Sequence, residues 1–146
     1  MICLTKLGNY LGRTIEIADW SGTEQVHSGV LESSVLLLVL GIDMPLETLR
    51  AFVKMLIGQQ PLAIMLFGTG ARAAFDLVIA ELNDGVRRKH VMTRLSEEDG
   101  IEDAIAELLQ SMWPSEDRFD EWKGYAVINV GGDITRIERA VKKLSN

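Results

Sequence analysis

Four stretches of the chain each join a mainly apolar run to a glycine-containing polar turn and then to a segment of helical periodicity. The apolar runs are residues 35–40, 62–67, 90–95 and 125–130. A strand that is covered by helices on both faces lacks polar alternation, so these runs predict buried strands of a parallel sheet. The run at 90–95 is more polar than the others and is expected nearer an edge.

Apolar residues spaced three and four apart follow each turn and predict four amphipathic helices. The predicted helices cover residues 46–57, 74–82, 101–112 and 134–144, and residues 115–122 predict a further short helix. Pro45 suits the start of the first helix because its missing N–H would have been unpaired there. Asp133 is expected to cap the last helix with its carboxylate.

Residues 1–33 have a different pattern. Apolar and polar residues alternate over 14–20, Ser21-Gly22-Thr23 interrupts them, and a weaker alternation resumes over 25–31. Two alternating runs around a Ser-Gly turn predict a β-hairpin, which is expected to extend an edge of the main sheet or to cover one of its faces.

The pattern as a whole predicts a single α/β domain over residues 1–146, with a hairpin region at 1–33 and four βα units at 34–146. Strands alternating with helices favour a three-layer, doubly wound, mostly parallel sheet, whose strand order the sequence leaves open. Residues 34–146 therefore resemble the broad class of Rossmann-like and flavodoxin-like domains. Such folds host many unrelated functions, so the resemblance implies no catalytic residue.

Composition narrows the class of protein further. The chain has 146 residues, 47% of them apolar, with a mean hydropathy of +0.13, which is typical of a globular domain and favours a homo-oligomer. No apolar run approaches the ~20 residues that span a bilayer, and the N-terminus lacks a signal-peptide pattern. We therefore expect a cytoplasmic protein with no membrane contact. Cys3 is the only cysteine, which excludes an intrachain disulfide.

Negative charge is concentrated in one part of the chain. The formal net charge is -6, and residues 91–124 carry ten Asp and Glu against three Lys and Arg. A nucleic-acid-binding protein normally has a basic stripe. The only candidate here is Arg87-Arg88-Lys89, which also suits the C-terminal end of a helix. The sequence thus predicts no nucleic-acid partner.

The turn after the second predicted strand is the sharpest motif. Gly68 and Gly70, followed by Ala73, match a relaxed dinucleotide fingerprint, in which glycines let backbone N–H groups approach a phosphate. Thr69 lies between the glycines, and Arg72 could supply a counter-charge to an anion. The alternative, which we favour, is that the glycines only make a tight turn between strand and helix.

Acidic residues at the ends of the strands give a second possible site. If their strands are neighbours, Asp43, Asp133 and one carboxylate among residues 97–99 would converge and could hold Mg²⁺. Helix capping explains the same aspartates without a ligand, and we favour it. His27 and His90 are isolated, and no nucleophile elbow or His/Cys metal spacing occurs. No cofactor and no catalytic residue is therefore predicted, and an enzyme is not favoured.

Segment 96–123 combines acidic residues with large aromatic ones. Trp113, Phe119 and Trp122 lie within ten residues of one another. Aromatic anchors inside a polar rim are typical of protein interfaces. The competing interpretation, to which we give equal weight, is that the aromatic side chains cover the core while the acids face solvent.

Two functional hypotheses follow. The leading one is a non-enzymatic binding module that contacts a protein partner, or a second copy of itself, through segment 96–123. The alternative is a domain that binds a nucleotide or another phosphate ligand at the turn formed by Gly68, Thr69, Gly70 and Arg72, with Asp43 and Asp133 nearby.

Overall fold

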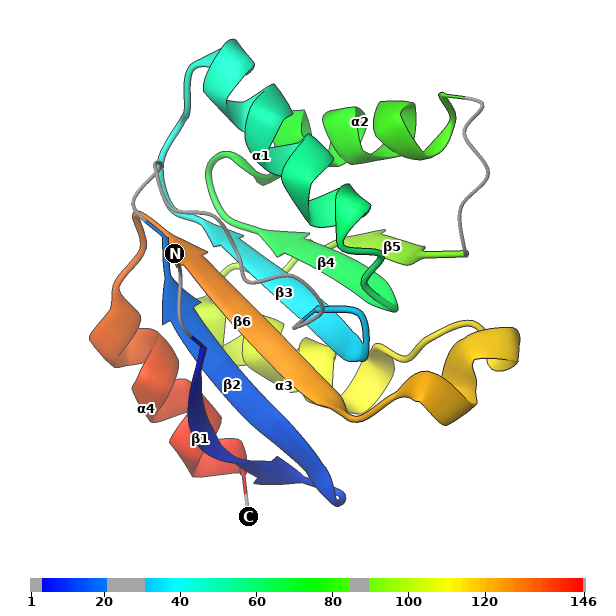
Figure 1. Cartoon of the computed structure of the whole chain (residues 1–146). Coiled ribbons are helices and arrows are strands. Elements are labelled where there is room, and N and C mark those ends of the chain that lie inside the picture. The colour runs from blue at the N-terminus through cyan, green and yellow to red at the C-terminus, as the bar shows by residue number, and fades with distance from the viewer. Residues whose placement is uncertain (1–3, 21–30, 85–89, 146) are drawn as a thin grey trace.

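The computed structural model describes residues 4–20, 31–84 and 90–145, which form a six-stranded sheet flanked by helices (Figure 1). The strands are β1 (Thr5–Tyr10), β2 (Arg13–Asp19), β3 (Ser34–Leu40), β4 (Ala63–Phe67), β5 (Met92–Leu95) and β6 (Gly124–Val130). Their order across the sheet is β1-β2-β6-β3-β4-β5. All neighbours are parallel except β1 and β2. The predicted α/β class with a mostly parallel sheet is confirmed, and β5 lies at an edge as expected.

The N-terminal strands pair differently from the prediction. β1 and β2 are antiparallel, and the two residues between them, Leu11 and Gly12, have φ of 50° and 82°, as a tight type I′ turn requires. β2 also pairs with β6, so both of its edges are occupied. Residues 14–19 therefore pair with β1 and β6 instead of the predicted partner at 25–31, of which residues 25–30 lie outside the described part of the chain.

Several residues singled out from the sequence lie outside the described part of the chain. They are Cys3, His27, the Ser21-Gly22-Thr23 turn and Arg87-Arg88-Lys89.

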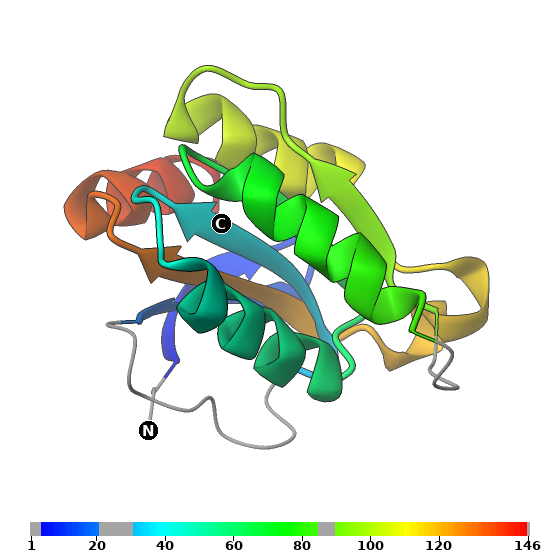
Figure 2. The ribbon, with the colours of Figure 1, turned by 90° about the horizontal axis from the view of Figure 1, so that it is seen from above.

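Four helices cover the two faces of the sheet, two on each side (Figure 2). Helices α1 (Leu46–Gly58) and α2 (Ala71–Leu82) lie on one face, and α3 (Ile101–Ser111) and α4 (Ile134–Leu144) on the other. A 3-10 helix, η1 (Glu116–Glu121), precedes β6. The Asp133 carboxylate accepts a hydrogen bond from the Arg136 backbone N–H at 3.2 Å, which confirms the predicted cap of α4.

The central strand β3 is apolar throughout because its side chains supply two cores. Alternate residues of a strand point to opposite faces. Leu36, Leu38 and Leu40 pack with α1 and α2, whereas Val35, Leu37 and Val39 pack with α3 and α4. All six are no more than 4% exposed. The absence of polar alternation that predicted this strand thus reflects burial on both faces.

Strand order decides where the carboxyl ends of the strands open. β6, the last strand of the chain, lies between β2 and β3. From β3 the chain continues into α1 on one face, and from its neighbour β6 into α4 on the other face. Adjacent parallel strands whose chains leave toward opposite faces create a crevice at their carboxyl ends.

Candidate functional site

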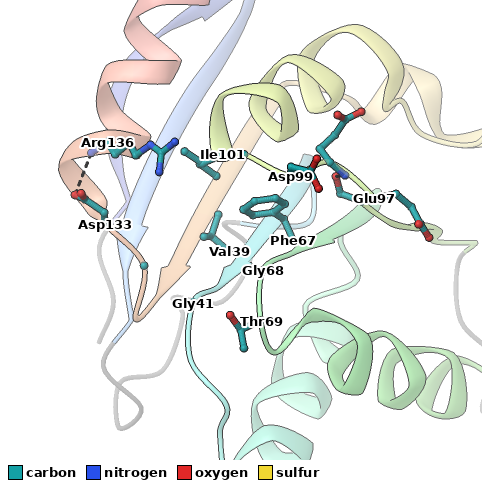
Figure 3. Close-up of a pocket in the computed structure, with 14 residues that line it drawn as sticks. Val39, Gly41, Phe67, Gly68, Thr69, Glu97, Asp99, Ile101, Asp133 and Arg136 are labelled. Atoms are coloured by element: carbon teal, nitrogen blue, oxygen red, sulfur yellow. Dashed lines mark hydrogen bonds between the residues drawn. The ribbon is translucent and has the colours of Figure 1, made fainter.

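A cleft of about 460 Å³ lies at the carboxyl edge of the sheet, on the side of α3 and α4. Its wall is formed by the ends of β3 and β4, the turn before α2, the loop before α3 and the start of α4 (Figure 3). Figure 3 shows Asp133 and Arg136 on one side of the opening and Glu97 and Asp99 on the other. The turns after the second, third and fourth predicted strands therefore border one concavity, together with Gly41 from the turn after the first.

Contacts between backbones account for the glycines at this edge. A Cβ atom on Gly41 would lie 2.8 Å from the Gly132 Cα, and one on Gly68 would lie 2.4 Å from the Leu40 carbonyl oxygen. Gly68 also has φ of +113°, which L side chains rarely adopt. The Gly70 N–H donates to the Leu40 carbonyl at 3.1 Å. These glycines let the turns pack tightly against the end of β3.

Asn129, near the end of β6, is a structural residue of the site that sequence reasoning missed. It is 1% exposed. Its side-chain amide donates to the Asp19 carboxylate at 2.9 Å and to the Gly132 carbonyl at 3.0 Å, and its oxygen accepts from the Gly132 N–H at 3.0 Å. These bonds hold the turn before α4 against β2. The available signal was a single amide in an otherwise apolar strand.

The lining of the cleft is acidic. Its charged residues are four carboxylates and one guanidinium, namely Glu97, Glu98, Asp99, Asp133 and Arg136. The four acids are exposed. An anion placed here would meet several like charges, whereas a cation would meet opposite ones.

Arg136 is already engaged by a neighbouring carboxylate. Its Nε donates to a Glu102 carboxylate oxygen at 2.9 Å. This hydrogen bond lowers the pKa of Glu102 below its usual 4.5 and raises the pKa of Arg136. The guanidinium is therefore paired with a carboxylate, and four carboxylates outnumber it in the lining of the cleft.

The residues predicted to bind a ligand are divided by the structure. Gly68, Thr69 and Asp133 line the cleft, and Gly70 and Arg72 lie outside its lining. Asp43 lines a separate cleft of about 450 Å³ on the other side of the turn at Gly131 and Gly132. Residues 96–101 and Arg136 border the first cleft as well, and of these only the carboxylates at 97–99 were anticipated.

The magnesium alternative required Asp43 and Asp133 to converge. Although β3 and β6 are neighbours as it assumed, the two aspartates line different clefts. Within residues 4–20, 31–84 and 90–145, no group of three or more His, Cys, Asp and Glu side chains is arranged to hold a metal ion. The arrangement therefore favours the capping interpretation for Asp133.

The aromatic side chains of segment 96–123 differ in their exposure. Trp113 is 53% exposed and Phe119 is 45% exposed. Trp122 is half-buried and makes edge contacts with Phe119 and Tyr125, with ring centroids 5.4 and 5.5 Å apart. Its indole N–H donates to the Gly124 carbonyl at 3.0 Å. Trp122 thus serves packing, whereas Trp113 and Phe119 remain accessible.

Arg118 is the second structural residue that the sequence did not reveal. It is 2% exposed, and its guanidinium donates to the carbonyls of Gln60, Pro61 and His90, each at 3.0 Å. Its Nε lies 3.5 Å from a Glu121 carboxylate oxygen. In the sequence it reads as one more surface charge of an acidic segment, so no signal distinguished it. In the fold it fixes η1 to the loops that precede β4 and β5.

Comparison of the chain with protein-family models, with curated proteins and with solved structures gives no match. None of the helices in the described part of the chain is both long and apolar enough to cross a membrane. The functional assignment therefore depends on the geometry of the two surfaces described above.

Proposed function

We propose that this protein is a small-molecule-binding domain whose ligand carries an amine or guanidine group and sits in the cleft at the carboxyl edge of the sheet. One observation carries the proposal: the cleft is lined by four carboxylates, and its only guanidinium is held by Glu102. The proposal assigns binding and no catalytic step.

The electrostatics favour a cation over a phosphate. Bringing a phosphate beside Glu97, Glu98 and Asp99 would cost free energy through repulsion between like charges, and Arg72 does not line the cleft to offset it. An ammonium or guanidinium group instead gains charge-assisted hydrogen bonds to carboxylates. The proposed ligand is therefore a cation instead of the phosphate that the sequence suggested, although Gly68 and Thr69 still line the site.

The size and the apolar wall limit the ligand further. A cleft of about 460 Å³ lies in the range of small-molecule sites, roughly 300–1,000 Å³. Val39, Phe67 and Ile101 contribute apolar lining beside the carboxylates. The best match is a compact cation with a short alkyl or aromatic body.

We propose further that the sheet belongs to the doubly wound, Rossmann-like or flavodoxin-like class. The observation that supports this class is that the chain leaves β3 toward α1 on one face of the sheet and leaves the neighbouring β6 toward α4 on the other face. In that class ligands bind at the carboxyl edge where strand order reverses, which is where this cleft lies.

The test measures the melting temperature and calorimetric binding at low ionic strength with agmatine, putrescine, spermidine and tyramine, in parallel with ATP and inorganic phosphate. We expect at least one amine to raise the melting temperature and the two phosphate compounds to leave it unchanged. The cleft variant Glu97→Gln, Glu98→Gln, Asp99→Asn should bind that amine at least tenfold more weakly.

A control variant with the same change in net charge separates the cleft from general electrostatics. Asp43→Asn, Glu47→Gln, Asp76→Asn replaces three exposed carboxylates that do not line the cleft, and it should bind the amine within about twofold of the wild type. Equal losses in both variants, binding of the phosphates alone, or no binding by any amine would overturn the proposal.

A further inference from the structure

The exposed aromatic residues of segment 96–123 lie at the other end of the sheet from the cleft. Phe119 belongs to η1, immediately before β6, and Arg118 ties η1 to the carbonyls that precede β4 and β5. These loops meet the amino ends of the parallel strands, whereas the cleft lies at their carboxyl ends. The two surfaces are therefore separate.

Core packing does not account for the exposure of these side chains. Trp113 and Phe119 are 53% and 45% exposed, whereas Trp20 is 6% exposed, 4.1 Å from Phe52 between ring centroids. Large aromatic side chains contribute most when they are buried. Trp113 and Phe119 are both about half exposed on one short segment. This exposure favours the interpretation that a partner covers the two side chains.

The segment that carries Phe119 is held in place before any partner binds. The buried Arg118 guanidinium makes three hydrogen bonds to loop carbonyls, and Trp122 is fixed by its bond to the Gly124 carbonyl. Phe119 packs edge-on against Trp122. Preorganisation of this kind lowers the conformational entropy that binding would otherwise cost.

Charge on this surface selects among partners. Glu116, Asp117 and Asp120 flank Phe119 on η1 and are exposed. The hydrogen bond from the Ser115 hydroxyl lowers the pKa of Asp117, which keeps this carboxylate ionised to lower pH. Nucleic acids and anionic membranes would be repelled by these carboxylates. A basic segment would be attracted.

The molecule itself contains an example of the expected contact. The Arg13 guanidinium carbon lies 3.7 Å from the centroid of the Trp122 ring and 5.4 Å from that of Phe119. Its Nε is buried and has no hydrogen-bond partner among the described residues. Arg is the cation most often found stacked on aromatic rings in this way.

We infer that the aromatic surface, comprising Trp113 and Phe119 with the carboxylates of Glu116, Asp117 and Asp120, binds an arginine-rich segment of a partner protein. The aromatic side chains receive guanidinium groups by stacking, and the carboxylates draw the basic segment in and pair with it. The Arg13 guanidinium lies closest to Trp122 and farther from Phe119, so the partner engages Trp113 and the exposed part of the Phe119 side chain.

The test uses fluorescence anisotropy with a labelled peptide of six Arg-Gly pairs and a matched peptide of six Lys-Gly pairs. We expect the arginine peptide to bind more tightly than the lysine peptide, and both to weaken as salt is added. The aromatic variant Trp113→Ala, Phe119→Ala should bind the arginine peptide about tenfold more weakly. The acidic variant Glu116→Gln, Asp117→Asn, Asp120→Asn should lose a similar factor and show a smaller salt dependence.

Two controls keep the outcome interpretable. Leu46→Ala truncates an equally exposed apolar residue elsewhere, 57% exposed, and the control variant at residues 43, 47 and 76 removes three carboxylates; both should bind within about twofold of the wild type. If the double aromatic variant fails to fold by circular dichroism, Trp113→Ala alone should still weaken binding about threefold.

The inference is overturned if arginine-peptide binding is unaffected by the aromatic substitutions, since the attraction is then only electrostatic. It is also overturned if sedimentation shows a wild-type dimer that the aromatic variant loses, because the occupant of the surface is then a second copy of the chain.

Discussion

Replacing Arg118 with methionine should destabilise the protein by about 3 kcal/mol, because methionine keeps the apolar stem but leaves three backbone carbonyls without their donor. The hydrogen bond from Arg118 to the Pro61 carbonyl is buried, and losing this donor costs about 1–3 kcal/mol. The hydrogen bonds to the carbonyls of Gln60 and His90 are partly buried. Water can replace the lost donor there, so losing each of these hydrogen bonds costs about 0.5–1 kcal/mol.

A smaller opposing contribution comes from the charge itself. The guanidinium is almost fully buried, and its nearest carboxylate, on Glu121, is 3.5 Å away. Removing a poorly compensated charge from a buried site recovers part of its desolvation cost. The carbonyl losses outweigh this gain because no side chain of the variant can donate to them.

Urea unfolding followed by tryptophan fluorescence measures this change. With a slope of about 2 kcal/mol per M, a loss of about 3 kcal/mol lowers the unfolding midpoint by about 1.5 M. Arg136→Met is the matched control, since it breaks an exposed ion pair at 2.9 Å and should leave the midpoint close to that of the wild type. Equal midpoints for the wild type and Arg118→Met would refute the view that this arginine anchors η1.

Two further predictions concern the turn after β4 and the ion pair of Arg136. Gly68→Ala should lower the free energy of unfolding, measured in urea, by about 2–4 kcal/mol, because the new Cβ would lie 2.4 Å from a backbone oxygen at φ of +113°. The control Gly58→Ala, whose new Cβ meets no neighbouring atom within 4 Å, should raise it by about 0.5–1 kcal/mol. Equal effects of the two substitutions would contradict the backbone-contact argument. The hydrogen bond from Arg136 lowers the pKa of Glu102 below 4.5, so its stabilisation is present above pH 4.5 and is lost as pH falls through the lowered pKa. The stability difference between wild type and Glu102→Gln should therefore shrink below pH 4.5, and a difference independent of pH would count against this ion pair.

Local patterns sufficed for most elements but not for β1. Residues 35–40 and 62–67 are apolar because they are buried on both faces, and the helices follow the spacing of their buried residues. β1, with the sequence TKLGNY, has only partly buried or exposed residues, so it lacks the alternation that would have identified it. It is a strand because β2 offers it an edge.

The two structural polar residues show a related limit. Asn129 and Arg118 are buried by partners far away in sequence, Asp19 and the loop at residues 60–61. Asparagine and arginine side chains are mostly exposed in proteins, so residue type alone predicts that Asn129 and Arg118 lie at the surface. Only the approach of distant backbone and side-chain groups makes their burial favourable.

The sequence by itself determined most of the elements, their alternation and the glycine turns, because periodicity and turn chemistry act over a few neighbouring residues. Only the tertiary structure decided that β6 lies between β2 and β3, since strand order depends on pairing between distant segments. In the folded chain Asp43 and Asp133 line different clefts although β3 and β6 are neighbours, Arg72 lies outside the first cleft, and the acidic residues 97–99 line it together with Gly68. The four repeated turns therefore marked the edge of the sheet that carries the candidate site, while the three-dimensional packing set its charge.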